Sequence, residues 1–282
     1  MPLTVSDASA CLLGMAFLIG TTFGQDDSSR TAWAEPMRSV HAKFSGEPGT
    51  LACFGDSITV TMAFWAPLQL GPPRKMDEAT AADYELVKRS MQPKCWREWK
   101  GPDFGCAGGM TIRWAHENVE RWLSTMKPEV AVIMFGSNDL TQLEADEYQR
   151  RTRAVIMSCL DQGTVVILST IPPRHDHVAK AQQFAEIVRQ LGRELKVPVC
   201  DYMAEIVKRR SDDWDGTLPQ FRDRSGYEVL TLVSGDGVHP SNPRDFPNDF
   251  SDQGLRTNGF ALRNYVVLRD YARVIRLVLE RR

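Results

Sequence analysis

The chain has 282 residues, and its 34 basic and 36 acidic side chains give a formal net charge of −2. Lys and Arg are spread along the chain without a basic block, which excludes nucleic acid as an expected partner. Apolar residues make up 43% of the sequence, which excludes a disordered chain and predicts a packed core. A chain of this length suits one α/β domain or two smaller domains.

The first 24 residues have the pattern of a secretory signal peptide. An apolar run from Ala10 to Ile19 is followed by small residues, and it is too short to span a membrane comfortably. The residues before it include Asp7 and no Lys or Arg, and no A-x-A cleavage site follows. We therefore expect a secreted or periplasmic protein with no stable membrane association, and a mis-assigned start or an uncleaved anchor are the alternatives.

The residues after this segment divide into an arm and a domain. Residues 25–48 are polar and lack a hydrophobic period, which predicts a linker or an N-terminal arm that lies on the domain. We expect the domain itself to cover residues 49–282.

Apolar strand-like runs alternate with amphipathic helical segments from residue 51 onward. Continuously apolar strands joined by helices are typical of a parallel sheet that is covered on both faces. The runs expected to form strands are 51–55, 130–136, 164–170 and 197–202, with a fifth near 102–106. The segments expected to form helices are 111–126, 144–163, 179–196 and 258–282. The fold class is therefore α/β, a three-layer α/β/α sandwich with a parallel, flavodoxin-like sheet of about five strands.

Two segments, residues 67–104 and 211–257, are rich in Pro, Gly, Asp and Trp and are longer than ordinary connections. Long loops at the ends of parallel strands are where ligands bind in open α/β sheets, so we expect irregular, ligand-binding loops here. Trp96, Trp99 and Trp214 lie in these segments and are candidates either for stacking on sugar rings or for anchoring the loops.

The six cysteines are too few for a disulfide scaffold in a chain of this length. Cys53, Cys159 and Cys200 lie in apolar patterns and are predicted to pack in the core. Cys95 and Cys106 flank a short loop and could form a disulfide in an exported domain, and the sequence leaves their redox state open.

Ser57 follows the first predicted strand in the sequence GDSIT. A serine hydroxyl is a weak nucleophile near neutral pH, so a nucleophilic serine needs a base and a group that orients the base. Taken alone, Ser57 is more typical of a helix N-cap. His239 is the best candidate base because Asp236 lies three residues before it between two glycines, and the alternative is an Asp-Gly turn with a surface histidine.

Four short blocks occur in order along the chain: GDSIT (55–59), GCAGGMT (105–111), GSND (136–139) and DGVH (236–239). In this order and approximate spacing they resemble the four sequence blocks of the SGNH hydrolases, also called GDSL esterases and lipases. The resemblance extends from about residue 50 to residue 282, which is the whole predicted core. It implies a serine esterase that uses no cofactor and no metal.

The resemblance also implies a role for each matched residue. Ser57 is the implied nucleophile, His239 the general base and then the general acid, and Asp236 the residue that orients His239. The implied oxyanion-hole donors are the backbone N–H groups of Ser57 and Gly109 and the side-chain amide of Asn138.

The sequence departs from the family pattern in the second block. Phe104 stands where the family often has an asparagine, so a supporting hydrogen bond must be replaced, and Gly108 adjoins Gly109 as an alternative donor. Beside the matched residues, Asp56 is expected to hold its loop by hydrogen bonds, and Asp139 to cap the helix that follows it.

Arg174 and His175 follow the third predicted strand, which is parallel to the first. These two residues are candidates for contact with the substrate, and a solvated loop is the alternative that the sequence favours. His175 and His177 also form an H-x-H pair that could bind a metal, but this spacing is common and we predict no metal site.

The expected function is hydrolysis of carboxylic esters through an acyl-enzyme. We expect short acyl groups, because no long apolar run outside the core is available to bind a fatty chain. The expected export, the polar loops and their tryptophans suggest acetyl groups on carbohydrates, by analogy with the family that the chain resembles. The expected partner is thus a small-molecule or glycan ester. One alternative is a lipolytic acyl hydrolase or thioesterase that uses the same residues, and another is a non-catalytic carbohydrate-binding module of the cell envelope.

Overall fold

The structure, a computed structural model, describes residues 31–280. The predicted signal peptide, residues 1–24, and the first residues of the predicted arm lie outside this range, so export stays a prediction. Within the described residues the sheet has four parallel strands in the order β1-β2-β3-β4. The strands are β1 (Leu51–Gly55), β2 (Val130–Met134), β3 (Val165–Ser169) and β4 (Val199–Cys200).

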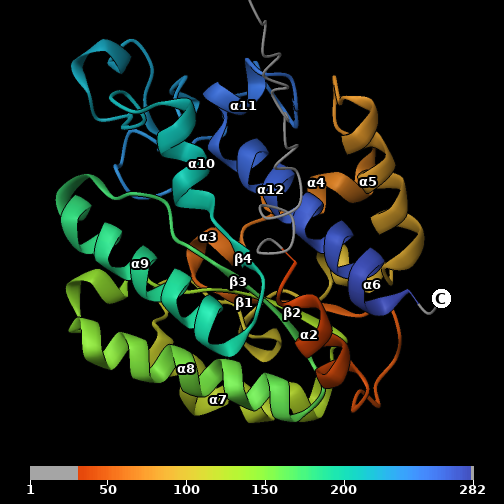
Figure 1. Cartoon of the computed structure of the whole chain (residues 1–282). Helices are drawn as coiled ribbons and strands as arrows, with labels where there is room; N and C mark the ends of the chain where they lie inside the picture. Colours follow the sequence, from red (N-terminus) through yellow and green to blue (C-terminus); the bar gives the residue numbers. More distant parts are fainter. Residues whose placement is uncertain (1–30, 281–282) are drawn as a thin grey trace, which may run out of the picture. The chain divides into compact units, whose positions relative to one another are not determined.

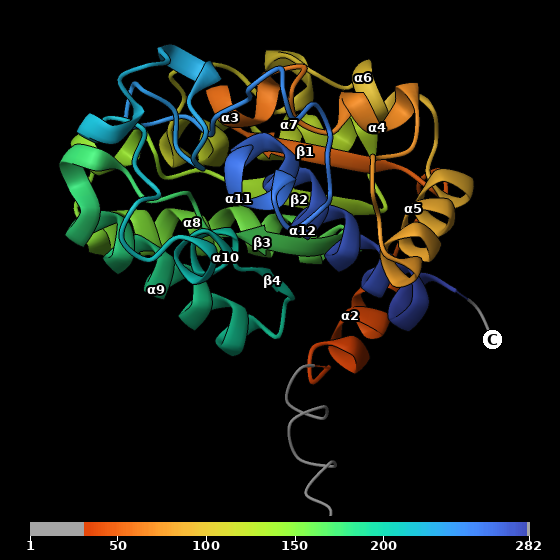
Figure 2. The ribbon, with the colours of Figure 1, turned by 90° about the horizontal axis from the view of Figure 1, so that it is seen from above.

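Helices cover both faces of this sheet, and every residue of β1, β2 and β3 is buried. Helices α7, α8 and α9 lie side by side on one face (Figure 1). Helix α12 covers the opposite face with α5 and α10 beside it (Figures 1 and 2). These helices are α5 (Glu78–Ser90), α7 (Ile112–Met126), α8 (Ala145–Asp161), α9 (Val178–Leu195), α10 (Tyr202–Arg209) and α12 (Gly259–Val274). The predicted three-layer α/β/α sandwich with a parallel sheet is confirmed.

The fifth strand expected near residues 102–106 is reduced to an isolated bridge from Gly55. The Gly55 N–H donates to the Gly105 carbonyl (3.0 Å), and the Gly55 carbonyl accepts from the Ala107 N–H (3.2 Å). Both groups therefore face the edge of β1 away from β2, where a flavodoxin-like sheet has its outer strand. Pro102 has no N–H for a ladder, and Gly105 has a φ of 85°, which strands do not use.

The segment 67–104 is not irregular throughout, because it contains the 13-residue helix α5. Asp77 caps this helix by accepting the Thr80 N–H (2.7 Å), and the helix packs against α12 with Tyr84 and Val87 buried. The remaining helical elements are short: α2 (Ala34–His41), α3 (Ser57–Val60), α4 (Ala66–Leu70), α6 (Lys94–Arg97), α11 (Gly254–Thr257), the 3₁₀ turns η1 (Pro102–Phe104), η2 (Asp139–Thr141), η3 (His175–His177), η4 (Pro219–Phe221) and η5 (Gly226–Glu228), and the π-helical η6 (Ile275–Leu279).

Helix α2 lies within the segment 25–48, for which the sequence indicated no helix. Its Met37 is buried, and the Arg38 guanidinium donates to the Leu277 carbonyl (2.6 Å) in η6. His41, at the end of α2, contacts the Glu129 carboxylate (2.8 Å) beside β2. Residues from Trp33 onward therefore belong to the same compact unit as the sheet.

None of the helices between residues 31 and 280 combines the length and the apolar character that crossing a bilayer requires.

The cysteines within the described residues are free and buried: Cys53, Cys95, Cys106, Cys159 and Cys200. The Cys95 Sγ accepts the N–H of Leu51, and the Cys106 Sγ accepts that of Gly101, both at 3.3 Å. Cys95 and Cys106 are therefore not joined by a disulfide, and each thiol is fixed by its own backbone partner. Cys11 lies outside the described residues.

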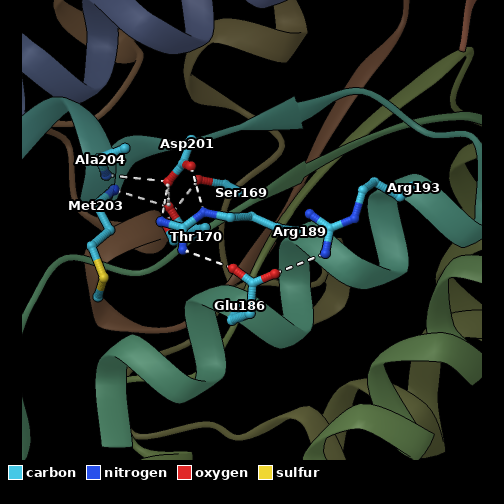
Figure 3. A network of polar contacts seen from close by, with 8 residues as sticks. All are labelled: Ser169, Thr170, Glu186, Arg189, Arg193, Asp201, Met203 and Ala204. Atoms are coloured by element: carbon cyan, nitrogen blue, oxygen red, sulfur yellow. Dashed lines mark hydrogen bonds and ion pairs between the residues drawn. The ribbon is translucent and has the colours of Figure 1, made fainter. Parts of the chain in front are cut away.

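A polar network ties the ends of β3 and β4 to α9 and α10 (Figure 3). Asp201, which follows β4, accepts two hydrogen bonds from the Arg189 guanidinium of α9 (2.6 and 3.0 Å). It also accepts the Thr170 hydroxyl (3.1 Å) and caps α10 through the Ala204 N–H (3.2 Å). The Thr170 oxygen in turn accepts the Met203 N–H (2.9 Å). One carboxylate thus joins a strand end, a crossover helix and the start of the next helix.

We expect Asp201→Ala to lower the free energy of unfolding by about 2 kcal/mol, because it removes a helix cap and leaves Arg189 and Thr170 without their acceptor. Glu186→Ala is the matched control, since Glu186 is 57% exposed in its ion pairs with Arg189 and Arg193 and should contribute less than about 1 kcal/mol. Urea unfolding measures both variants, and equal losses would contradict the role of Asp201.

Candidate active site

Ser57 lies at the carboxyl end of β1, where the chain turns into α3. The N-cap of α3 is Asp56, whose Oδ1 accepts the Ile58 N–H (3.0 Å). Ser57 is the first residue of the helix, so the interpretation of its side chain as the N-cap is wrong. Asp56 holds the loop by a hydrogen bond, as the sequence indicated.

Two cations, the buried Arg263 and the half-buried Lys100, hold the backbone of α3 and the residue that follows it. The Arg263 side chain on α12 is 0% exposed; its guanidinium donates to the Ile58 carbonyl and to the Thr59 hydroxyl (2.9 Å). The guanidinium also lies 3.7 Å from the centre of the Phe64 ring. The Lys100 ammonium donates to the Thr59 carbonyl (2.9 Å). Burial lowers the pKa of both Arg263 and Lys100.

The loop before α11 carries His239 and Asp236. The His239 Nε2 lies 2.9 Å from the Ser57 Oγ, and the His239 Nδ1–H donates to the Asp236 Oδ2 (2.7 Å). The other carboxylate oxygen of Asp236 accepts the Ser234 hydroxyl (2.7 Å) and the N–H groups of Val238 (2.8 Å) and His239 (2.9 Å). Burial opposes ionisation of Asp236, but these hydrogen bonds outweigh it and lower its pKa below the usual range.

This arrangement makes a proton transfer from serine to histidine geometrically direct. With its Nδ1–H held by the Asp236 carboxylate, the His239 imidazole presents the lone pair of Nε2 to the Ser57 hydroxyl. The structure therefore brings together the three residues that the sequence singled out for nucleophile, base and orienting group.

Asn138 and the second sequence block lie beside Ser57. Asn138 lies in the loop after β2. Its side-chain amide donates one N–H to the Met110 carbonyl (2.9 Å), which leaves the second N–H available. A Cβ built on Gly108 would lie 3.9 Å from the Ser57 Cβ, and one on Gly109 would meet no atom of the described residues within 4 Å. Gly109 has a φ of 77°, which favours glycine. The backbone N–H groups of Ser57 and Gly109 have no acceptor within residues 31–280.

Asp139 caps a different helix from the one expected. Its Oδ1 accepts the N–H of Ile112, the first residue of α7 (2.8 Å), so it does not cap the helix that follows it in the chain. The second oxygens of Asp139 and Asp56 are both buried without a hydrogen-bond partner among the described residues. Burial raises the pKa of Asp139 to about 7, and the neighbouring charge of Asp56 adds to this effect. Burial likewise raises the pKa of Asp56 to about 6.

Arg174 and His175 support the loops of the site. The Arg174 guanidinium donates to the Ser137 carbonyl (2.7 Å), next to Asn138. The backbone N–H of His175 donates to the carbonyl of Gly237 (2.9 Å), a residue between Asp236 and His239 in the chain. The predicted contact of these two residues with substrate stays a prediction.

The imidazoles of the H-x-H pair point to different carboxylates. The His175 Nδ1 contacts Asp215 and the Thr217 hydroxyl (3.0 Å), whereas the His177 Nε2 lies 3.6 Å from Asp176. Within residues 31–280, no group of three or more His, Cys, Asp or Glu side chains is placed to hold a metal ion.

A pocket of about 320 Å³ opens beside Ser57 and His239. Its walls come from the segment after α3 and from the long segment 211–257, and its lining residues are Ser57, Thr61, Ala63, Tyr227, Glu228, His239, Asn242, Arg244 and Phe260. The composition of segment 211–257 indicated a ligand-binding loop but not these side chains, because the exposed aromatic residue of the pocket is a tyrosine, whereas tryptophan is the aromatic residue that stands out in the two long segments.

None of the three loop tryptophans is among the residues that line this pocket. Trp96 is buried and stacks on Trp65 with 5.1 Å between the ring centres. Trp99 and Trp214 are partly buried against the hydrophobic core. Anchoring of the loop is therefore the role that the structure gives to Trp96.

A serine, a histidine and an aspartate linked in this order at the carboxyl edge of a three-layer α/β sandwich define the class of serine hydrolases. Residues 53–243 match the GDSL-like lipase/acylhydrolase family. The chain belongs to this family and is a carboxylic ester hydrolase, as its four sequence blocks indicated.

Solved structures of similar fold include the lipase/acylhydrolase from Enterococcus faecalis, with a TM-score of 0.50 and 15% identity over 79% of this chain and 94% of that chain. A catalytic mutant of an acetylxylan esterase from Geobacillus stearothermophilus has a TM-score of 0.49 and 18% identity over 82% and 96% of the two chains. The acetyl xylan esterase AlAXEase has a TM-score of 0.47 and 18% identity over 73% and 96%. At 15% identity the first likeness shows the fold and nothing about the substrate. Among curated proteins, no match to the chain was found.

The buried carboxyl of Asp139 predicts a dependence of stability on pH. An unfolded aspartate titrates near about 4, whereas the pKa of folded Asp139 is raised to about 7. Between these values the folded state binds more protons than the unfolded state, so the free energy of unfolding falls as the pH rises. Asp139→Asn stays neutral and keeps an oxygen for the Ile112 N–H, so its unfolding free energy relative to the parent should increase from pH 5 to pH 8.

Chemical unfolding of the parent and of Asp139→Asn at pH 5 and at pH 8 measures this difference. The asparagine adds a buried N–H group, whose cost is the same at the two pH values and therefore does not affect the change with pH. Asp161→Asn, at an exposed position on α8, is the control and should show no such change. A difference for Asp139→Asn that is independent of pH would contradict the raised pKa.

Proposed function

We propose that this ester hydrolase acts on short acyl esters, in particular acetyl esters of carbohydrates, through an acyl-enzyme on Ser57. The observation that supports it most directly is the line of contacts from the Ser57 Oγ to the His239 Nε2 (2.9 Å) and from the His239 Nδ1 to Asp236 (2.7 Å). A non-catalytic binding module would need none of these contacts.

Acylation begins as the Ser57 oxygen attacks the ester carbonyl carbon and its proton passes to the His239 Nε2. The Asp236 carboxylate stabilises the imidazolium that forms, because its own pKa is low enough to keep it charged. The carbonyl oxygen becomes an oxyanion, and the donors proposed for it are the N–H groups of Ser57 and Gly109 and the free amide N–H of Asn138. Each such donor typically contributes about 3 kcal/mol to the stability of the transition state.

The tetrahedral intermediate then collapses, and the His239 imidazolium gives its proton to the departing alcohol oxygen. The acyl group stays on the Ser57 oxygen as an ester. Water attacks this ester while His239 takes a proton from the water, and a second collapse releases the carboxylic acid and restores the Ser57 hydroxyl. The cycle consumes one water and one ester and regenerates both side chains.

The lining of the pocket supports a short acyl group and a polar alcohol. Besides Tyr227, its lining includes two apolar side chains, Ala63 and Phe260, which offer a small apolar surface for a group such as a methyl. The rest of the wall carries hydrogen-bonding side chains from segment 211–257, which suits a hydroxyl-rich alcohol better than a fatty one.

Ser57→Ala should lower kcat/KM for 4-nitrophenyl acetate by on the order of 10⁵-fold, because no other group can form the acyl-enzyme. Asp236→Asn should lower it by about 10⁴-fold, since the histidine loses the partner that fixes its tautomer. A fluorophosphonate should label the parent protein at Ser57, as read by mass spectrometry of the peptide. Ser124→Ala, at an exposed site on α7, is the control. Full activity of Ser57→Ala would rule out the assigned nucleophile.

The length of the acyl group is tested with a series of 4-nitrophenyl esters from acetyl to decanoyl. An apolar acyl channel would gain about 0.8 kcal/mol for each buried CH₂ group, so activity would rise along the series. We expect instead that kcat/KM is highest for acetyl and falls with length. A maximum at octanoyl or longer would support the lipolytic alternative and contradict the short-acyl proposal.

A further inference from the structure

The side of Ser57 on which the alcohol must leave follows from the position of His239. The His239 Nε2 both accepts the Ser57 proton and returns it to the departing oxygen, so the alcohol has to lie on the His239 side of the nucleophile. The 320 Å³ pocket is lined by both Ser57 and His239 and therefore lies where the alcohol departs.

An exposed aromatic ring forms one wall of this pocket. Among the large hydrophobic side chains that are exposed within the described residues, Tyr227 is the aromatic one, and it is 46% exposed. Its ring centre lies 6.0 Å from that of His239, and the two rings are inclined by 60°. Tyr227 thus places an exposed aromatic ring beside the group that protonates the leaving oxygen.

Unused hydrogen-bonding groups surround the ring. The Asn242 side-chain oxygen accepts from the Asn258 amide (3.1 Å), whereas its Nδ2 donates to no group of the described residues. Glu228 and Arg244 form an ion pair (3.0 Å) in which Arg244 is 90% exposed. The terminal nitrogens of Arg244 have no acceptor within residues 31–280. The pocket therefore combines one apolar face with an amide donor, a carboxylate and guanidinium donors.

Backbone contacts hold these groups in place relative to the base. The Asn242 N–H donates to the Tyr227 carbonyl (2.8 Å), and the Gly235 N–H donates to the Gly226 carbonyl (2.8 Å). Gly235 directly precedes Asp236, so the backbone at Tyr227 is tied to the loop that carries the orienting carboxylate. Because the backbone that carries the ring is held in this way, only the side-chain torsions of Tyr227 have to be ordered when a ligand stacks on it.

We propose that Tyr227 is the platform of a leaving-group subsite that binds a pyranose ring. The C–H face of the sugar stacks on the tyrosine ring, and the hydroxyl groups bond to the Asn242 amide and to the Glu228–Arg244 pair. The inference rests on the proposed function, because it assigns the sugar of the acetylated substrate to one place in the site.

The test compares two acetyl esters whose alcohols differ in the presence of a sugar ring. The first is methyl β-xylopyranoside carrying one acetyl group, and the second is 2,2,2-trifluoroethyl acetate, whose alcohol has no ring to stack. Tyr227→Ala should lower kcat/KM for the sugar ester by about tenfold, mainly through KM, and change that for trifluoroethyl acetate less than about twofold. Tyr227→Phe keeps the ring face and should behave as the parent with both esters.

Leu70→Ala is the matched control, since Leu70 is a hydrophobic side chain that is 77% exposed and does not line the pocket. An equal effect of Tyr227→Ala on the two esters, with a parent that hydrolyses both, would overturn the subsite and leave the proposed function intact. A parent that hydrolyses trifluoroethyl acetate and no acetylated sugar would overturn the carbohydrate part of the proposed function and the subsite with it.

Discussion

The burial of the Arg263 guanidinium under α3 is the interaction on which the position of Ser57 depends. Arg263 comes from the last long helix of the chain, 205 residues after Ile58, yet it donates to that residue's carbonyl and to the Thr59 hydroxyl. A buried donor that loses its hydrogen-bond acceptor costs about 1–3 kcal/mol, and a charged donor such as this guanidinium costs more. Docking of α12 on the sheet and placement of Ser57 are therefore coupled.

Much of the site could be predicted from the sequence because the carboxyl ends of parallel strands meet at one edge of the sheet. Ser57 follows β1 and Asn138 follows β2, so recognition of two apolar strands was enough to place both at that edge. The contact of His239 with Asp236 is local, since it spans three residues and turns at Gly237, which has a φ of 71°. Such contacts depend on short-range geometry and on the order of strands, and both are visible in a sequence.

The features that could not be predicted depend on contacts between segments without a hydrophobic period. Tyr227 and Asn242 line the pocket together and are joined by a backbone hydrogen bond, and nothing in the sequence of the irregular segment 211–257 indicates that pairing. Asp139 caps α7 from a loop 27 residues away, so a rule based on the neighbouring residues assigns it to the wrong helix. Helix α5 was missed because the prolines and glycines before it dominate the composition of its segment, whereas its burial against α12 is a tertiary effect.

The buried thiols have a consequence for how the opening of this fold can be followed. Only the thiolate reacts readily with alkylating reagents, and burial raises the pKa of Cys53 to about 12 and that of Cys95 to about 11. In the closed protein these groups are both shielded and protonated, so a reagent modifies them only when the surrounding structure separates. Cys53 lies in strand β1 of the sheet, and Cys159 lies in α8, in the helix layer that covers one face of the sheet. The modification rates at the two positions would therefore report whether sheet and helix layer separate together or in turn.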